Sequence, residues 1–255
     1  MKKIIIKIIQ GFLSPFISNP KIFLKTKDII FLNPAEHLYR LIQYIKSQKT
    51  NFIGMTIIDI GCADGGTSVY FAKAFNQCKV IGYEPIPFQF GIAKMKAEKH
   101  ENIRIKNIAL SNFIGTANFN ITANFLSSSI NEIQQNQLNK ETKEHQKKFE
   151  IIEKQEVQVT TLDEEYKNIE NILLIKMDTQ GTELKVLEGG KNTLQKTKFV
   201  LIEQSNHQIY KDSCSYFETD EFLRKNGFGM VDIIVTYRKN GCVTEFDAIY
   251  QKLGL

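Results

Sequence analysis

Short runs of β-branched and other apolar residues recur along the chain, and most of them end at a polar residue. Runs of this length and composition are typical of buried strands. The predicted strands are Thr56–Ile60, Val80–Tyr83, Ile103–Asn107, Val157–Thr161, Ile172–Asp178 and Phe199–Glu203, then the pair Met230–Val235 and Val243–Tyr250. Between them, apolar residues at helical spacing predict helices over Pro34–Lys46, Thr67–Phe75, Phe88–Lys99, Glu183–Glu188 and Tyr216–Lys225.

This alternation of strands and helices predicts an α/β sheet of the nucleotide-binding kind. The last two strands are expected to be antiparallel at the edge of the sheet. Neither an internal repeat nor a Pro- or Gly-rich linker divides the chain. We therefore expect one α/β domain over residues 56–255, preceded by an N-terminal helical extension over residues 1–55.

Two stretches depart from the alternation. Ile108–Ile121 alternates apolar and polar positions around Gly115, which predicts an added hairpin. The insertion, residues 124–153, is rich in Ser, Gln, Asn, Lys and Glu and favours a solvated helix or loop. The alternative is a mobile lid over a substrate. After the strand that follows the insertion, Asp163 is expected to cap a short helix.

The first residues combine an apolar run with lysines. Lys7 interrupts the run Met1–Ile17, which is too short to cross a bilayer and is followed by no small-residue cleavage site. We therefore expect neither a signal peptide nor a membrane span. Two hypotheses remain: the segment packs on the body of the protein or on a second subunit, or residues 1–30 contact an anionic membrane surface.

Composition narrows the classes of partner. The 255 residues carry a net charge of +5, but only four of the 33 basic residues are arginines. Because guanidinium is the preferred group for bidentate contacts with phosphates and bases, this profile argues against a nucleic-acid partner. The four cysteines, at positions 62, 78, 214 and 242, show neither a Cys-x-x-Cys pair nor metal-ligand spacing. They are expected to be buried thiols in a reducing cytoplasm.

A glycine turn follows the strand Thr56–Ile60. Gly61 permits a sharp turn, and Gly65 permits close approach of the backbone to a ligand where the next helix begins. Their spacing matches neither the Gly-x-Gly-x-x-Gly dinucleotide fingerprint nor a P-loop. Glu84, at the end of the second strand, stands where a carboxylate accepts the hydroxyls of a ribose. These residues predict a ligand that contains a nucleoside.

Other polar residues also stand at strand ends. Asn107, Asp178 and Glu203 each close a predicted strand, as Glu84 follows one. In an open α/β sheet, ligands bind beyond the carboxyl ends of the strands. We therefore expect these side chains to share one site with the glycine turn.

Several motifs follow one another in a recognisable order. They are Asp59-Ile-Gly61, Glu84-Pro85, Asn107-x-Ala109-Leu110, Ser127–Ser129, Thr161-Leu-Asp163, Lys176-x-Asp178-x-Gln180-Gly181-x-Glu183, Leu187-x-Gly189 and Glu203. Together they resemble the FkbM-type methyltransferases over residues 55–235. The stretch from Lys176 to Glu183 is the most specific part, whereas the glycine turn is shared by many methyltransferases. The chain departs from the family at Cys62-Ala63-Asp64, where an Ala-Asn pair is more usual.

The resemblance implies a fold, a cofactor and a reaction. The fold would be a Rossmann-like sheet, mostly parallel with an antiparallel edge strand and with helices on both faces. The cofactor would be S-adenosyl-L-methionine, and the reaction O-methylation of a small-molecule or glycan acceptor, for which we favour a bacterial surface glycan. The alternatives are a nicotinamide-dependent oxidoreductase and a non-catalytic nucleotide-binding protein of the same fold.

The resemblance also assigns cofactor contacts by position. The methionine end would be held by the first turn, at Asp59, Gly61, Cys62 and Gly65. Glu84 would hold the ribose. Asn107 and Ala109 would border the adenine, and Asp178 would lie near the transferred methyl group.

Methyl transfer to an alcohol also needs a group that accepts the hydroxyl proton. Asp178 is the first candidate, and its alternative roles are to bind the ammonium of the donor or to cap the turn at Gly181. His207 is the second candidate, because an imidazole titrates near neutrality. Glu203 is the third catalytic candidate. These three residues could instead hold a divalent cation that activates the hydroxyl, although we assign no metal.

Overall fold

The structure is a computed structural model that describes residues 36–48, 51–206 and 208–254. The chain divides into two compact units, Met1–Ser47 and Gln48–Leu255, and each is described by itself. The described part of the first unit is helix α3 (Glu36–Ser47), as the spacing of its apolar residues predicts. The hypotheses on packing or membrane contact through residues 1–30 lie outside the described residues. Within the described ranges, no helix has both the length and the apolar character that a membrane crossing requires.

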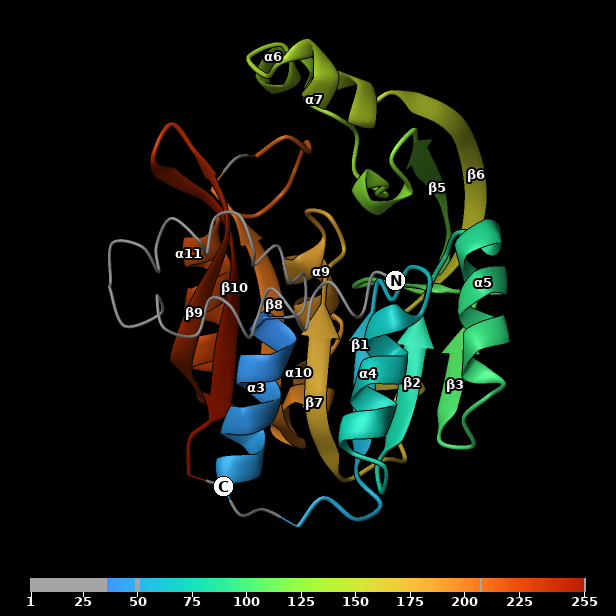
Figure 1. Ribbon diagram of the computed structural model, residues 1–255, viewed down its shortest axis with the longest axis vertical. Helices are drawn as coiled ribbons and strands as arrows, with labels where there is room; N and C mark the ends of the chain where they lie inside the picture. Colours follow the sequence, from blue (N-terminus) through green and yellow to red (C-terminus); the bar gives the residue numbers. More distant parts are fainter. Residues whose placement is uncertain (1–35, 49–50, 207, 255) are drawn as a thin grey trace, which may run out of the picture. The chain divides into compact units, whose positions relative to one another are not determined.

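The second unit is built on a seven-stranded sheet (Figure 1). Its strands are β1 (Thr56–Ile60), β2 (Lys79–Tyr83), β3 (Ile103–Lys106), β7 (Ile172–Met177), β8 (Thr197–Ser205), β9 (Phe228–Lys239) and β10 (Cys242–Lys252). They lie in the order β3-β2-β1-β7-β8-β10-β9. The strands from β3 to β8 in this order are parallel, and β10 is antiparallel to both β8 and β9. The mostly parallel sheet with an antiparallel edge is confirmed.

Helices cover both faces of this sheet (Figure 1). One face carries α4 (Gly66–Ala74) and α5 (Pro87–Ala97), and the other carries α9 (Glu183–Glu188), α10 (Lys191–Gln195) and α11 (Tyr216–Lys225). Every residue of the central strands β1 and β7 is buried, which explains why both are mainly apolar. A core of strand and helix side chains that includes Ile58, Ile175 and Leu187 fills the space under α9 and α10.

A second, three-stranded sheet replaces the predicted hairpin. Its strands are β4 (Ala109–Leu110), β5 (Gly115–Thr122) and β6 (Ile151–Thr160), in the order β4-β6-β5. The hairpin prediction was wrong, because β4 and β5 do not pair with each other: β4 runs parallel to β6, and β5 runs antiparallel to it. The alternation around Gly115 reflects an apolar face that β5 shares with its neighbour β6. On this face Val157 and Val159 pack with Phe119 and Ile121.

The insertion is more ordered and more buried than its composition suggests. It contains the 3-10 turn η2 (Phe125–Ser127) and the helices α6 (Gln135–Leu138) and α7 (Lys143–Lys148), and β6 begins before it ends. The prediction of a solvated segment was wrong at three places: the serines Ser127–Ser129 are buried, and Leu138 and Phe149 form a small core with Ile209 and Tyr210. Polar side chains of the insertion form hydrogen bonds with the turn that follows β7.

The short helix α8 (Leu162–Glu165) is capped differently from the prediction. The Thr161 hydroxyl accepts the backbone N–H of Glu164 and is the N-cap. Asp163 lies inside the helix, and its carboxylate accepts the backbone N–H groups of Asn192 and Thr193 at the start of α10. Asp163 therefore caps a helix, but one that is distant in sequence.

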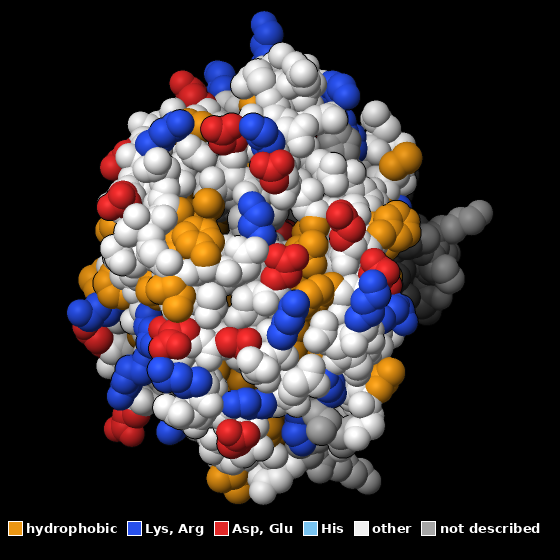
Figure 2. Space-filling view, turned by 180° about the vertical axis from the view of Figure 1, so that it is seen from behind, with side chains coloured by type: hydrophobic (Ala, Val, Ile, Leu, Met, Phe, Trp, Pro, Cys, Tyr) orange, Lys and Arg blue, Asp and Glu red, His pale blue; other side chains and the backbone are white. Residues whose placement is uncertain are grey.

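Charged side chains of both signs are interspersed over the face that Figure 2 shows. Their mixture agrees with the modest net charge of +5. The absence of a nucleic-acid partner stays a prediction from composition.

Candidate active site

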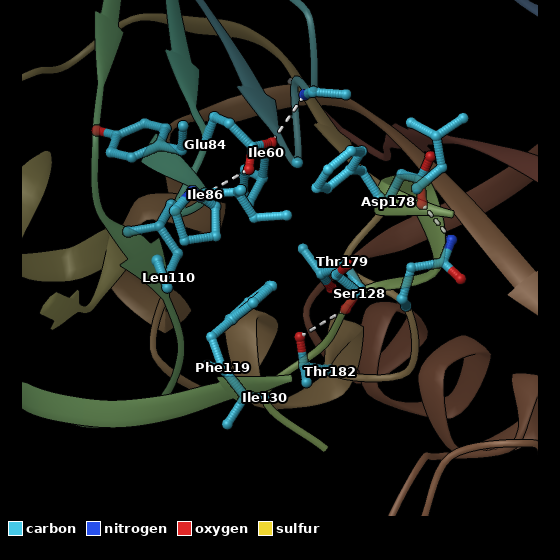
Figure 3. A pocket seen from close by; sticks show the side chains of 18 of the residues that line it. Ile60, Glu84, Ile86, Leu110, Phe119, Ser128, Ile130, Asp178, Thr179 and Thr182 are labelled. Atoms are coloured by element: carbon cyan, nitrogen blue, oxygen red, sulfur yellow. Dashed lines mark hydrogen bonds between the residues drawn. The ribbon is translucent and has the colours of Figure 1, made fainter. Parts of the chain in front are cut away.

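A pocket with about 620 Å³ of space opens at the carboxyl ends of β1, β2 and β7 (Figure 3). One side, which we call the strand-end wall, is formed by Gly61, Glu84, Asp178 and their neighbours in the turns after these strands. The other side, the insertion wall, comes from the second sheet and the insertion, and consists mainly of Phe119, Phe125, Leu126, Ser128 and Ile130. Within the strand-end wall, Glu84 and Asp178 lie at opposite ends (Figure 3).

The first turn brings β1 into contact with the end of β7. Gly61 has a φ of +69°, and a Cβ there would lie 1.9 Å from the carbonyl oxygen of Asp178, so only glycine fits. Gly65 has a φ of +77°, and a Cβ there would lie 3.0 Å from the Cα of Ala93 in α5. Gly65 is not among the residues that line the pocket, so its role in the structure is to let α5 pack against the start of α4.

Glu84 is held in place by backbone donors. The N–H of Ala63 donates to Glu84 Oε2 at 2.9 Å, and the N–H of Ile86 donates to Oε1 at the same distance. Each carboxylate oxygen keeps a further lone pair that a ligand hydroxyl can use. Burial raises the pKa of Glu84 to about 7, although the two backbone donors favour the charged form.

Asp59 lies behind the first turn, and it does not line the pocket. Its side chain is fully buried, and Oδ2 accepts the Ser68 hydroxyl at 2.7 Å. Oδ1 lies 3.5 Å from Nζ of Lys176, which also donates to the carbonyl of Gly61 at 3.2 Å. Burial alone would lower the pKa of Lys176, but the carboxylate of Asp59 and its acidic neighbours raise it. Asp59 and Lys176 therefore fix the turn from beneath.

Cys62 lies under the same turn. Its side chain is buried, and a Cβ on Gly82 would meet its sulfur at 2.9 Å. Burial, helped by the nearby charge of Asp59, raises the pKa of the thiol well above its usual value. Cys62 is thus a protonated packing residue in this structure, and its backbone forms part of the turn.

Asn107 and Ala109 take different positions after β3. The side-chain amide of Asn107 donates to the carbonyl oxygens of Glu84 and Pro85 at 2.8 and 2.9 Å, which fixes the turn after β2. Ala109 lines the pocket itself. It belongs to an apolar region, formed with Ile86, Phe119 and Phe125, that suits a flat ring such as a purine.

The turn after β7 places Asp178 in the pocket and Glu203 behind it. The side chain of Asp178 is 37% exposed, and its Oδ2 lies 3.8 Å from Lys176 Nζ. Gln180 has a φ of +54°, and its Nε2 donates to Asp178 Oδ1 at 2.8 Å and to Glu203 Oε2 at 2.9 Å. The two carboxyl groups predicted at neighbouring strand ends are therefore joined through one amide.

Several acidic groups crowd this end of β8 and β10. Burial raises the pKa of Glu203 well above its usual value, and the charge of Asp178 adds to the effect. Burial, with the charge of Asp178, likewise raises the pKa of Asp247 to about 7. Glu245 also has a raised pKa because of burial and Asp178. The cluster therefore keeps protons at neutral pH that ordinary carboxyl groups would release.

A second cavity lies on the far side of Gln180. It has about 560 Å³ of space and shares Gln180 with the first pocket. Its lining is largely polar and includes Glu203, Gln204, Tyr210 and Glu245, with Phe149 as an aromatic member. Gln204 Nε2 is buried and has no hydrogen-bond partner among the described atoms.

The residues that hold the Asp178 turn were not predicted to form one network. The Ser129 hydroxyl donates to the carbonyl of Gln180 at 2.8 Å, and the Asn131 amide donates to that of Gly181 at 2.9 Å. The Tyr210 hydroxyl lies 3.0 Å from Gln180 Oε1 and 2.8 Å from the carbonyl of Ser127. Gln180 and the serines stand in the motifs quoted above, but Tyr210 carried no signal in the sequence.

His207, the second candidate base, lies outside the described residues, so its role stays a prediction. Among the residues that are described, no three His, Cys, Asp or Glu side chains are arranged to hold a metal ion. The cation hypothesis, which required His207, stays untested.

Comparisons with known proteins place the chain among methyltransferases. The sequence model of the methyltransferase FkbM domain matches residues 59–230. The 2-O-methyltransferase NoeI of Sinorhizobium fredii (strain NBRC 101917 / NGR234) is 28% identical over 167 residues, which cover 61% of this chain and 65% of that protein. The chain thus spans less than two thirds of that relative.

Two solved structures are similar at low identity. The magnesium protoporphyrin IX methyltransferase (ChlM) of Synechocystis PCC 6803 with bound SAM has a TM-score of 0.49 at 10% identity, and the similarity covers 97% of this chain and 96% of that one. An rRNA methylase of Streptococcus thermophilus has a TM-score of 0.48 at 10% identity, covering 85% and 96%.

Proposed function

The chain belongs to the methyltransferase FkbM domain family, and from that premise we propose that it methylates a hydroxyl group of a sugar or another small hydroxylated acceptor. S-adenosyl-L-methionine is the methyl donor of the family. One observation carries the proposal: Glu84 and Asp178 lie at opposite ends of the strand-end wall of one pocket. The family match favours this function over the nicotinamide-dependent oxidoreductase.

The residues that line the pocket suit the donor chemically. We assign the ribose hydroxyls to Glu84, whose carboxylate is already oriented by two backbone donors. The apolar region at Ile86, Ala109 and Phe119 would take the adenine ring, and the backbone at Gly61 and Ala63 would lie along the methionine end. In this assignment Asp59, Cys62 and Asn107 act by holding the turns, and Gly65 acts by packing α5.

Asp178 is the proposed base. S-adenosylmethionine supplies a methyl group on a positively charged sulfur, so the acceptor oxygen has only to attack and to lose its proton. Asp178 lines the pocket at the end of the wall away from Glu84, and its Oδ2 lies 3.8 Å from the ammonium of Lys176. Most of the rate would come from holding the acceptor oxygen close to the methyl carbon, which is worth up to roughly 7–11 kcal/mol in favourable cases.

The acceptor is proposed from the relative and the second cavity. The name of the similar protein, a 2-O-methyltransferase, supports oxygen as the methylated atom. The second cavity shares Gln180 with the donor pocket, and most of its lining residues are polar, which suits a hydroxylated ring. We favour a bacterial surface glycan as the acceptor, and a cytoplasmic location in which the four free cysteines stay reduced.

Two measurements test the proposal. Calorimetry with S-adenosylmethionine, S-adenosylhomocysteine and NAD should show binding of the first two and none of NAD. Extracts of a deletion strain should then be incubated with the protein and methyl-labelled S-adenosylmethionine. A glycan fraction of these extracts should become labelled, and the same fraction from the parent strain should take up less label. NAD binding would reject the donor assignment. Donor binding without label in any fraction would favour the non-catalytic alternative.

A further inference from the structure

The side chain of Gln180 connects three groups that come from different parts of the chain. Its two N–H bonds are both used, one on Asp178 Oδ1 at 2.8 Å and one on Glu203 Oε2 at 2.9 Å. Its carbonyl oxygen faces the Tyr210 hydroxyl at 3.0 Å. An amide nitrogen has only two protons to donate, and Gln180 donates both of them to the two carboxyl groups.

We propose that Gln180 is a positioning residue that holds Asp178 and Glu203 as one acid–base pair and leaves Asp178 Oδ2 to accept the acceptor's proton. The proposal rests on the proposed function in one respect, namely that Asp178 is the base.

The geometry distinguishes the two oxygens of Asp178. Oδ1 is occupied by the amide of Gln180, whereas Oδ2 lies 3.8 Å from Lys176 Nζ. Asp178 lines the donor pocket, and Glu203 lines the second cavity. Gln180 lines both cavities, so its amide links a carboxyl group of the donor pocket to one of the second cavity.

The backbone of Gln180 supports a role for its side chain. With a φ of +54°, Gln180 adopts a conformation that glycine adopts with less strain, and the next residue of the turn is in fact Gly181. Such conformations persist when the surroundings hold them, as the Ser129 hydroxyl does here by donating to the Gln180 carbonyl at 2.8 Å. A residue needed only to turn the chain would not require the amide.

The charges around the pair explain why it needs donors. Glu245 and Asp247 from β10, Glu183 from α9 and the Tyr210 hydroxyl face it. The charges of Lys176 and Lys148 act against these acidic groups. Two carboxylates in such surroundings favour a state with one shared proton. Burial and the charge of Asp178 raise the pKa of Glu203, which favours Glu203 as the carrier of that proton.

The reaction then balances at the pair. The O–H bond of the acceptor breaks, its proton binds Asp178 Oδ2, and its electron pair stays on the oxygen that bonds the methyl carbon. The sulfur keeps the electrons of the broken carbon–sulfur bond. The pair begins with one proton and ends with two, and it releases one to water before the next turnover.

The test is a pH titration of the side-chain carboxyl groups in the full-length protein by ¹³C NMR. Wild type should show two coupled steps for Asp178 and Glu203, with the upper step well above the ordinary carboxyl range. Glu203→Gln should abolish the upper step and assign it. Gln180→Gly suits the backbone and removes both donors, so it should raise the upper step by about one pH unit or more, because the doubly charged state loses its donors.

Tyr210→Phe is the matched control. It removes the anchor of the amide oxygen but keeps both N–H donors, so the upper step should move by less than half as much as in Gln180→Gly. Thermal unfolding followed by circular dichroism should show that all variants are folded. Equal titration in wild type and Gln180→Gly, or an unchanged titration of Asp178 in Glu203→Gln, would overturn the proposal.

A kinetic measurement links the pair to turnover. In the labelled-glycan assay, Gln180→Gly should lower the rate at least tenfold at pH 7 and shift the pH–rate profile upward, with the affinity for S-adenosylhomocysteine unchanged. A loss of rate without a shift of the profile would mean a structural role alone. If the protein bound no S-adenosylmethionine, the proposed function would fail, but the NMR titration would still decide whether Gln180 holds the pair.

Discussion

The two walls of the donor pocket are built in different ways. The strand-end wall consists of turns that immediately follow β1, β2 and β7, so each of its residues is placed by a strand next to it in sequence. The insertion wall is made by side chains such as Phe119 and Ile130, which reach the pocket through a second sheet whose strands are distant in sequence. The strand-end wall carries the polar groups, and the insertion wall carries mainly apolar ones and a serine.

The two walls therefore have different tasks: the strand-end wall carries the reactive and ligand-binding groups, and the insertion wall encloses the site. Strand ends in a parallel sheet meet at one edge by construction, which is where a charged or polar ligand can be recognised. The insertion wall encloses the site, and it also reaches across to the turn at Gln180 through Ser129 and Asn131. Changes in the strand-end wall should therefore affect chemistry and binding most, and changes in the insertion wall should affect the precision of the turn.

The largest effect should come from Asp178, where the strand-end wall meets the acceptor side. Asp178→Asn keeps the shape and removes the base, so kcat should fall by about 10²–10⁴-fold. The affinity for S-adenosylmethionine, measured by calorimetry, should change less than threefold. Asp232→Asn, on the edge strand β9, is the control and should keep wild-type kinetics. An unaltered kcat in Asp178→Asn would show that the base is another residue.

Gly61 tests how closely the strand-end wall is packed. Gly61→Ala should cost about 3 kcal/mol of stability, because it combines an unfavourable φ with a severe clash. The Cβ would lie 1.9 Å from the Asp178 carbonyl oxygen. Gly54→Ala is the matched control, since Gly54 has a φ of +74° and nothing within 4 Å of its Cβ position. Urea unfolding should show a much smaller loss for Gly54→Ala, and equal losses would mean that backbone strain alone matters.

Glu84 tests ligand recognition at the other end of the strand-end wall. Glu84→Gln replaces one carboxylate oxygen by an NH₂ group, which cannot accept the backbone N–H of Ala63 or Ile86 that it then faces. The change also removes an acceptor for the ribose. The Kd for S-adenosylmethionine should rise about 10–100-fold, as expected for hydrogen bonds to a charged group. Glu98→Gln, at an exposed position after α5, should bind as wild type does. A Kd within twofold of wild type would refute the ribose assignment.

Asp247 tests the acidic region beyond both walls. Its pKa of about 7 in the folded protein lies above the usual 3.8, so folding disfavours its charged form. Protonated Asp247 makes its full contribution to the free energy of unfolding below pH 4. This contribution is lost as the pH rises through 7, because the buried carboxyl group then becomes charged. Asp247→Asn should therefore be about 1–2 kcal/mol more stable than wild type at pH 8 and no more stable at pH 4. Chemical denaturation at both pH values measures this, and a difference that does not depend on pH contradicts it.

Ser129 tests the reach of the insertion wall and should show the smallest effect. Ser129→Ala removes the hydroxyl that donates to the carbonyl of Gln180, which should cost about 1 kcal/mol of stability and lower kcat a few fold. Thr116→Val removes a hydroxyl that bonds Glu156 on the exposed face of β5, and it should leave kcat unchanged. Equal kinetics in the two variants would show that the insertion encloses the site without tuning it.

Most of the main sheet could be predicted because its signals are local. The runs at Thr56–Ile60 and Ile172–Met177 are mainly apolar, since strands buried on both faces need no polar side. Tyr216–Lys225 was predicted with the bounds that the structure shows, because a capping box at Ser215 and Glu218 starts it and Gly227, with a φ of +81°, follows its end.

The second sheet could not be predicted in the same way. The alternation before and after Gly115 shows that two strands have an apolar face, but it does not show which strand covers them. The partner, β6, begins at Ile151, inside a segment whose composition is typical of solvated chain. The buried serines and Asn131 follow the same rule, because a polar side chain is buried when distant carbonyl groups accept its protons, as those of Gln180 and Gly181 do here.

The sequence by itself determined the α/β class, the glycine turn and the carboxylates at the strand ends, because each depends on neighbours in the chain: a strand, the turn after it and the residue that closes it. Tertiary structure alone decided what those residues do. It placed Asp59 under the turn instead of in the pocket, put Gly61 against the Asp178 carbonyl, and joined Asp178 to Glu203 through one amide. A residue's type shows which bonds it can make, and only the fold brings the partner within reach.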